Sequence, residues 1–483
     1  MNYLRKYYPG YTARVLALLT CLAISACGGG GGGNGSNGGT NPGAPPATSV
    51  QVTQGPIDGF GSVIVHGIHF DTNGSDFIID DDPGVQDQLR VGQIVTIVGE
   101  HDGRRGTAKS VKYDKNLEGI VTSVDVANSQ FVALGQTVIV DAMTIFERVS
   151  LDTLTVGDFV EVSGFIDADG NIRATFVELE LTPPVEQELH GLISNLDTAT
   201  NTFTINAQVV DYSTASVIEV SGGMLQNGQF VEVKGSVNGT VFIAAKIEEE
   251  RESRDRDDRF RVEGFITALR LANNEFDLGS LTVRFNNATQ FRRGSSSDLA
   301  LNREVEVEGS IDDQGTLIAR EIEFEAHDAI EIEAFVDVVD INAGTVDLLG
   351  ITISVNANTR IRDKRDDIPD FNISDIAVGD FLEIRAVEDA GTYAAGRLER
   401  DKADNDISLQ GFVDAIDVSA NTLTLESVVV DFSSPSVEFE EVNGSPLSKD
   451  AFLSALSIGS LIEVKGSYNG SSILAEELEF EDD

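Results

Sequence analysis

The sequence predicts an all-β protein, built as a tandem array of about six small five-stranded antiparallel barrels after a flexible glycine-rich tether. Three observations support this prediction. A phrase of alternating apolar and polar residues recurs six times along the 483 residues, turn dipeptides such as Asn-Gly follow it, and no long amphipathic helix is evident. A small five-stranded module avoids exposed edges by closing into a barrel. The alternative is a flat sandwich shared between neighbouring copies.

The recurring phrase is clearest in 156–164, which reads Val-Gly-Asp-Phe-Val-Glu-Val-Ser-Gly. Its alternation of apolar and polar residues is the signature of a half-buried strand. The first copy has Thr96 where the others have Glu, and the fifth has Ala386 in place of the final Gly. The other copies occupy 91–99, 227–235, 305–309, 378–384 and 458–466.

A hairpin turn and a last strand follow each phrase. The strand carries an Ala with apolar residues three and five positions later, as in Ala319, Ile322 and Phe324. A step of three reverses the face of a regular strand, so we predict a β-bulge between Ala319 and Ile322, and likewise between Ala475 and Leu478. The alternative is an Ala that faces outward beneath a neighbouring loop.

The repeats divide the chain into six modules. Each opens with a β-rich strand, followed by a polar turn and two shorter strands. A mixed-charge linker at 251–259 separates the third module from the fourth and is expected to be the weakest junction. We expect each module to couple only to its neighbours along the chain. The predicted boundaries are 55–113, 117–180, 188–248, 261–325, 331–400 and 408–481.

The consensus resembles a bacterial family classed only as a domain of unknown function, found in tandem in secreted proteins and lipoproteins. The matching pattern is Val-Gly-Asp-x-Val-Glu-Val-x-Gly followed by Asp-Gly-x-Leu-x-Ala, and it covers about residues 55–481. Ala334 and Ala386 of the fifth module depart from it. The resemblance implies an OB-like barrel, which the residue pattern also favours over an SH3-like one, and a place in the cell envelope. It implies no activity.

The N-terminus predicts export and lipid attachment. Residues 1–26 form a basic segment and a short apolar run, which is typical of a signal peptide. The run ends in Ile24-Ser25-Ala26-Cys27, which resembles a bacterial lipobox and implies acylation of Cys27. Residues 27–50 then form a disordered tether. Gly28 favours an outer-membrane location, on the periplasmic side or the cell surface. The alternative is a plain signal peptide with an incidental Cys.

Composition excludes several classes of function. Asp and Glu number 80 against 34 Lys and Arg, giving a formal charge of -46. Such a surface repels nucleic acid and favours cations and basic partners. Cys21 lies in the leader and Cys27 carries lipid, so the folded modules have no thiol for disulfides, zinc or catalysis.

Few residues predict chemistry, and no catalytic residue is expected. His66 and His69 are three apart, so a shared metal would require a bulge at Gly67. The histidines do not repeat across modules and are expected to be ordinary half-buried residues; they are His66, His69, His101, His190 and His327.

Acidic turns are the remaining signal for a cofactor, and the cofactor would be calcium. The turns are expected to be solvated, with weak calcium binding as the alternative. The calcium candidates are Asp80, Asp81, Asp82, Asp167 and Asp169.

The pattern as a whole favours a non-catalytic envelope lipoprotein, with no cofactor, whose modules act as a spacer or interaction surface. Repetition without repeated chemistry supports this hypothesis, because catalysis needs one site with converging groups. The expected partners are the membrane and an envelope protein or polysaccharide. A calcium- or polysaccharide-binding adhesion protein is the alternative, and a hydrolase with paired carboxylates is a third hypothesis.

Overall fold

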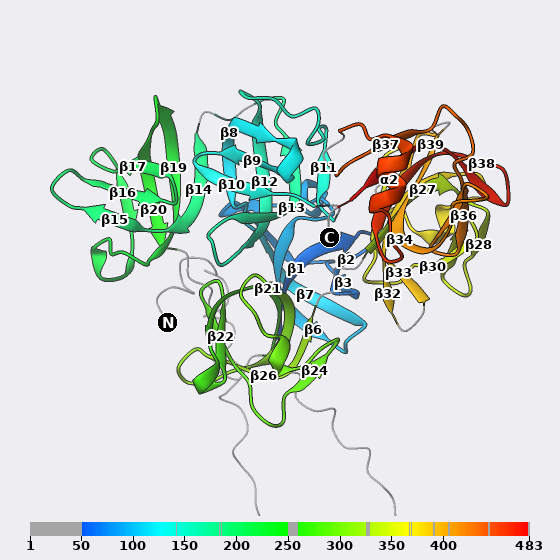
Figure 1. Cartoon of the computed structure of the whole chain (residues 1–483). Coiled ribbons are helices and arrows are strands. Elements are labelled where there is room, and N and C mark those ends of the chain that lie inside the picture. The colour runs from blue at the N-terminus through cyan, green and yellow to red at the C-terminus, as the bar shows by residue number, and fades with distance from the viewer. Residues whose placement is uncertain are drawn as a thin grey trace, which may run out of the picture. The chain divides into compact units, whose positions relative to one another are not determined.

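The computed structural model is all-β apart from one short α-helix and several 3-10 turns in the residues it describes (Figure 1). The predicted leader, Cys27, the tether and His327 lie outside the described residues. No helix in the described part of the chain is long and apolar enough to cross a membrane. The described residues are 51–141, 143–182, 184, 186–249, 259–324, 329–366, 368, 370–389, 392–403, 406–442 and 445–481.

Module 2 shows the closed barrel. Its strands pair in the ring β8–β9–β10–β13–β12–β8. All of these pairings are antiparallel except β10–β13, which is parallel. This is the predicted OB-like barrel, but the expectation of purely antiparallel strands is wrong. The long connection through β11 and β12 lets the chain return in the same direction, which a parallel pair requires. The strands are β8 (Leu117–Asp125), β9 (Gln130–Ala133), β10 (Gln136–Ile139), β11 (Ile145–Glu147), β12 (Phe159–Ile166) and β13 (Ile172–Leu179).

Modules 1, 4 and 6 close the same ring with one unbroken first strand. A short helix, α2 (Lys449–Ala455), is added in module 6. Module 1 uses β1 (Gln51–Gly59), β2 (Val63–Val65), β3 (Ile68–Asp71), β6 (Ile94–His101) and β7 (Arg105–Tyr113), with β4 (Asp76–Ile79) and β5 (Asp82–Gly84) beside β7. Module 4 uses β21 (Arg259–Arg270), β22 (Glu275–Leu278), β23 (Leu281–Arg284), β24 (Gln290–Arg292), β25 (Glu304–Ile311) and β26 (Leu317–Phe324). Module 6 uses β34 (Ile407–Asp417), β35 (Thr422–Leu425), β36 (Val428–Asp431), β37 (Glu438–Glu440), β38 (Leu461–Tyr468) and β39 (Ser472–Phe480).

Modules 3 and 5 interrupt the first strand, so that two shorter pieces take its place. The remaining strands follow the order of module 2. Module 3 uses β14 (Gln187–Leu192), β15 (Ser194–Asp197), β16 (Thr202–Ile205), β17 (Gln208–Asp211), β18 (Val217–Glu219), β19 (Phe230–Asn238) and β20 (Val241–Glu249). Module 5 uses β27 (Ala329–Phe335), β28 (Val338–Asp340), β29 (Thr345–Leu348), β30 (Ile351–Ser354), β31 (Arg360–Asp363), β32 (Phe381–Asp389) and β33 (Thr392–Asp401).

The predicted β-bulge is confirmed in the last strand of every module. In module 4, Glu308 pairs with Glu321 and the next residue, Gly309, pairs with Ala319, so Arg320 is the extra residue. The bulge brings Ala319 and Ile322 to the same side, where both are buried in the core. The alternative of an outward-facing Ala is therefore wrong. The same register shift occurs between β6 and β7, β12 and β13, β19 and β20, β32 and β33, and β38 and β39.

The closing Gly of the repeated phrase is explained by this bulge. A Cβ placed on Gly164 would overlap the carbonyl oxygen of Arg173 and lie 2.8 Å from the Cα of Ala174. These are backbone atoms of the opposite strand, which cannot swing aside. Five of the six modules therefore keep Gly at this close approach, whereas module 5 accommodates the Cβ of Ala386 opposite Ala395 at its own bulge.

The barrels join in pairs through continuous sheets. Modules 2 and 3 pair where β8 meets β14, and modules 5 and 6 pair where β27 meets β34. Module 1 pairs with module 4, because β1 lies parallel to β21 over four residue pairs. The expectation that only neighbours along the chain are coupled is therefore wrong. An open strand edge accepts any strand that reaches it, so separation along the sequence does not forbid such a pair.

Candidate functional site

A row of mainly acidic side chains crosses the outside of five of the six barrels, those of modules 2 to 6. In module 2 the register places Glu118, Glu161 and Glu178 side by side on β8, β12 and β13. Glu161 faces outward because Val160 and Val162 point into the core. Like charges directly opposite one another destabilise a sheet unless cations neutralise them. The corresponding rows are His190–Glu232–Glu248, Glu263–Glu306–Glu323, Glu333–Glu383–Glu399 and Gln410–Glu463–Glu479, and module 1 has Gln54–Thr96–Lys112.

Lysine, arginine and histidine side chains neutralise these rows. Lys115 Nζ donates to Glu118 Oε2 at 2.6 Å and lies 3.7 Å from Glu161 Oε2. In module 5, Lys364 Nζ lies 2.6 Å from Glu399 Oε2, and Arg397 pairs with Glu383. The rows of modules 2 and 5 are thus largely buried ionic networks, whereas the cation of module 6, Lys465, is 46% exposed. Sequence reasoning identified the Glu of Val-Glu-Val but missed the second Glu, which recurs at a fixed offset in the last strand of modules 2 to 6.

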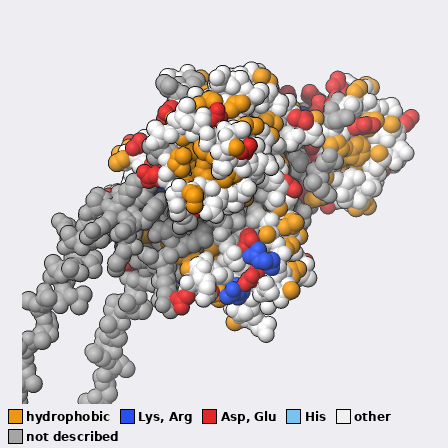
Figure 2. Space-filling view, turned by 90° about the vertical axis from the view of Figure 1, so that its left-hand side faces the viewer, with side chains coloured by type: hydrophobic (Ala, Val, Ile, Leu, Met, Phe, Trp, Pro, Cys, Tyr) orange, Lys and Arg blue, Asp and Glu red, His pale blue; other side chains and the backbone are white. Residues whose placement is uncertain are grey.

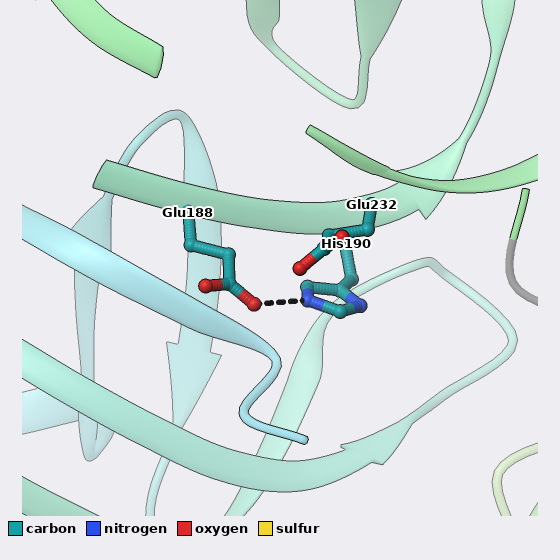
Figure 3. Close-up of side chains that lie close together, drawn as sticks. All are labelled: Glu188, His190 and Glu232. Atoms are coloured by element: carbon teal, nitrogen blue, oxygen red, sulfur yellow. Dashed lines mark hydrogen bonds and ion pairs between the residues drawn. The ribbon is translucent and has the colours of Figure 1, made fainter. Parts of the chain in front are cut away.

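The row of module 3 contains a histidine and forms the most enclosed group (Figure 3). His190 Nε2 lies 2.8 Å from Glu188 Oε1, and both residues come from β14. Glu232 on β19 pairs with His190 in the ladder. The three residues are 5%, 6% and 2% exposed in the order Glu188, His190, Glu232. One ligand atom from each lies within 4.8 Å of the others, so the group could hold a metal ion.

The pKa values of the two carboxyls lie far apart, although burial acts on both in the same direction. Burial alone would raise the pKa of Glu188, but the hydrogen bond and charge of His190, with help from Lys234, outweigh it and lower the value to about 2. For Glu232, burial and the negative charge of Glu188 raise the pKa to about 8. Lys234 Nζ lies 2.5 Å from Glu232 Oε1, and its own pKa is raised because the attraction of these carboxylates outweighs burial.

Two of the five calcium candidates, Asp80 and Asp81, lie close to the lysines that neutralise the rows of modules 2 and 3. Asp80 Oδ2 lies 3.0 Å from Lys115 Nζ. Asp81 Oδ2 lies 3.8 Å from Lys234 Nζ and 3.7 Å from Lys246 Nζ. Both aspartates of module 1 therefore pair with lysines outside it: Asp80 with Lys115 in the segment before module 2, and Asp81 with two lysines of module 3. Asp82 is exposed at the start of β5.

Asp167 and Asp169 lie in the β12–β13 hairpin and already accept hydrogen bonds from the protein. Asp167 accepts from the backbone amides of Asp169 and Asn171 and pairs with Arg173 Nε at 3.1 Å. Asp169 Oδ2 accepts from Asn302 Nδ2 of module 4 at 2.9 Å. Their oxygens thus hold a turn and an intermodule contact.

The structure does not bring His66 and His69 together. His66 is buried against module 4, with Nδ1 2.9 Å from Glu306 Oε2 and 3.6 Å from Glu263 Oε2. The attraction of these glutamates outweighs burial and raises the pKa of His66 to about 9, and that of Glu306 falls to about 2. His69 lies 3.4 Å from Ser62 Oγ instead.

His101 packs edge-on against Phe70, at 5.7 Å between ring centroids. His101 is half-buried, as expected. His69 is exposed, and the side chains of His66 and His190 are buried members of ion pairs, so the half-buried expectation is wrong for these three histidines.

A second repeated feature is the turn just before the strand that carries the repeated phrase, which is β6 in module 1 and β12 in module 2. In module 1 its tip residue, Val91, is buried against Ile145 and Phe176 of module 2. A Cβ on Gly92 would lie 2.6 Å from the carbonyl oxygen of Thr175, so the turn sits directly on the module 2 bulge. Gln93 Nε2 adds a hydrogen bond to Glu161 Oε1 at 3.1 Å.

The same turn is exposed in four other modules. Its tip residue is a large aliphatic side chain in each of them. Figure 2 shows one face of the molecule, on which apolar side chains gather in patches bordered by acidic ones. The exposed tips are Val156 (67% exposed), Leu301 (53%), Val378 (68%) and Ile458 (71%).

Comparison with known proteins gives one family and a distant structural likeness. No curated protein matches the chain. A solved structure titled "drosophila Unr CSD456" is 12% identical, covers 44% of this chain and 98% of its own, and superposes with a TM-score of 0.13. The family described as "Domain of unknown function (DUF5666)" matches residues 51–112, 118–178, 190–248, 263–323, 331–399 and 410–479. The chain therefore belongs to this family of unknown function and carries its domain six times in tandem.

Proposed function

We propose that this chain is a non-catalytic lipoprotein of the bacterial cell envelope whose modules present a binding surface to another envelope protein. Cys27 provides the lipid anchor and residues 27–50 provide the tether. Two or more acyl chains are needed for stable attachment, which the lipobox pattern supplies. The six modules repeat a core and a set of turns, while their polar rows are used in contacts within and between barrels.

The turn tips carry this proposal. Val91 is the tip that has a partner within the chain, and it is covered by Ile145 and Phe176. Val156, Val378 and Ile458 occupy the same position and remain largely exposed. Singly exposed apolar residues are common and need no explanation, but these three share the structural position at which Val91 docks onto module 2.

The partner must supply the apolar recess, because module 2 alone carries one at this position. The residue that follows the bulge is Phe176 in module 2. In modules 1, 3, 4, 5 and 6 it is polar, namely Ser110, Lys246, Glu321, Arg397 and Glu477. The binding partner is therefore an envelope protein with a recess of aliphatic and aromatic side chains.

Site-specific photocrosslinking in cells tests this role. A photoreactive residue at Val378 should yield one adduct of defined mass in the membrane fraction. The same residue at Ser419, an exposed position in another turn of the neighbouring module, is the matched control and should yield none. Changing Val156, Val378 and Ile458 together to Asp should abolish binding of the adduct partner while leaving the thermal unfolding temperature unchanged.

Equal crosslinking at Val378 and Ser419, or none at Val378, would overturn the proposal. Binding of calcium or a purified envelope polysaccharide that survives the triple substitution would instead support the alternative function of a surface adhesin.

A further inference from the structure

We propose that Glu188, His190 and Glu232 form a binding site for a divalent transition-metal ion of the zinc class, which ties β14 to β19 in module 3. This inference is independent of the protein-binding role proposed above. Four observations support it: the ligand set, the spacing of the ligand atoms, an unsatisfied buried oxygen and the local charge.

The ligand set favours zinc over calcium. One imidazole nitrogen and two carboxylates suit zinc and related metals, whereas calcium takes six to eight oxygens. The other acidic groups close enough to hold an ion are made of carboxylates alone. Those groups, within the described residues, are Asp81–Glu232–Glu248, Glu331–Glu333–Glu383, Glu438–Glu440–Glu477 and Glu463–Glu479–Glu481.

The spacing requires little movement. The three candidate ligand atoms lie within 4.8 Å of one another. Ligands in a tetrahedral zinc site lie about 3.3 Å apart, given metal–ligand distances of about 2.0–2.1 Å. Two of the ligands are glutamates, whose side chains can close the difference by small rotations. Figure 3 shows the carboxyls of Glu188 and Glu232 facing the same side of the His190 ring.

Glu232 provides the unsatisfied oxygen. The residue is 2% exposed, and its Oε2 finds no hydrogen-bond partner among the described residues, although Lys246 Nζ lies 3.9 Å away as an ion-pair partner. A buried polar atom left in this way is costly and calls for a ligand. The other oxygen, Oε1, is held by Lys234 at 2.5 Å. A hydrogen bond to one oxygen of a carboxylate fixes the orientation of the other oxygen, as groups that contact metal ligands commonly do.

The local charge also fits a divalent ion. Four carboxylates meet two ammonium groups here: Glu188, Glu232, Asp81 and Glu248 surround Lys234 and Lys246. A bound metal displaces the protons of its ligands, so Glu232, whose raised pKa otherwise favours the protonated form, and His190 both enter the metal site deprotonated. The excess is then two negative charges, which one divalent cation balances.

Metal titration of the mature chain tests the site. The protein, without residues 1–26 and stripped with a chelator, should bind one zinc ion by calorimetry, and cobalt(II) should give the absorption bands of a tetrahedral site. Calcium should not compete. His190→Gln is a mild change, because module 6 has Gln410 at the same register position. It should weaken zinc binding by about 100-fold or more, since even outer partners contribute 10–100-fold.

His101→Gln, at a partly exposed histidine of module 1, is the control and should leave zinc binding unchanged. The thermal unfolding temperature of metal-free His190→Gln, compared with metal-free wild type, shows whether the variant folds. Zinc binding that is equal in wild type and a folded His190→Gln variant overturns the proposal. The proposal is also overturned if the wild-type protein binds no zinc at micromolar concentration. It is overturned as well if the wild-type protein binds calcium as tightly as zinc.

Discussion

Replacing Gly164 by Ala tests the explanation of the repeated glycine. The new Cβ would lie 2.8 Å from the carbonyl carbon of Arg173 and from the Cα of Ala174. Carbon atoms pack at about 3.5–4.0 Å, so the two strands must separate by at least about 0.7 Å at the bulge. Overpacking of this kind costs about 1–3 kcal/mol. The entropy that Ala removes from the unfolded chain offsets only about 0.4–1 kcal/mol. The net destabilisation is therefore on the order of 1–2 kcal/mol.

Hydrogen exchange of the β12 and β13 amides measures this cost within the intact chain. A loss of about 1.4 kcal/mol makes exchange through local opening about tenfold faster. Gly264→Ala is the matched control, because its Cβ would meet Phe165 and Leu278 at 3.8 and 3.9 Å, which are ordinary contacts. The control should be neutral or slightly stabilising. If the β12 amides exchange as slowly in the Gly164→Ala variant as in wild type, the steric explanation of the repeated Gly at the bulge fails.

Two further predictions concern the contact of module 1 with module 4. The pKa of His66 is raised from 6.5 to about 9, so its stabilisation is complete below pH 6.5 and is lost as pH rises through 9, while Glu306 contributes above pH 4.5. By calorimetry, the stability advantage of wild type over His66→Gln should shrink by on the order of 3 kcal/mol between pH 6.5 and 9, and this comparison cancels the contribution of Glu232, whose pKa of about 8 lies in the same range. Trypsin should cut first within 251–259, yet the halves should stay together on gel filtration, because β1 pairs with β21; separation of the halves would contradict that sheet.

Local features of the fold could be predicted from the sequence because they have fixed spacings. The three-residue step from Ala319 to Ile322 required a bulge, and the structure has one there. The parallel β10–β13 pair could not be predicted, since a hydrophobic pattern does not encode strand direction. The pairing of β1 with β21 is also invisible in the pattern, because nothing local specifies which distant edge a strand will meet.

The candidate site was only partly predictable. Asp80 and Asp81 were singled out as acidic, and they do reach the polar junction, but as partners of lysines. The sequence shows His190 as an isolated histidine, because Glu232 becomes its neighbour only through the register of β14 against β19. The repeated Glu of the last strand is present in the sequence at a fixed offset, but its role depends on a row that crosses three strands and is therefore not visible in any one strand.

Membrane fractionation of a Cys27→Ser variant tests the central claim, that the modules are anchored to the envelope by lipid. Cells are labelled with palmitate, and the wild-type and variant chains are followed through separation of membranes from soluble protein. Wild-type protein should carry label and sediment with membranes, and the variant should be unlabelled and soluble. A variant that still sediments and still takes up palmitate would contradict the anchor at Cys27 and, with it, the proposed place of this protein in the cell.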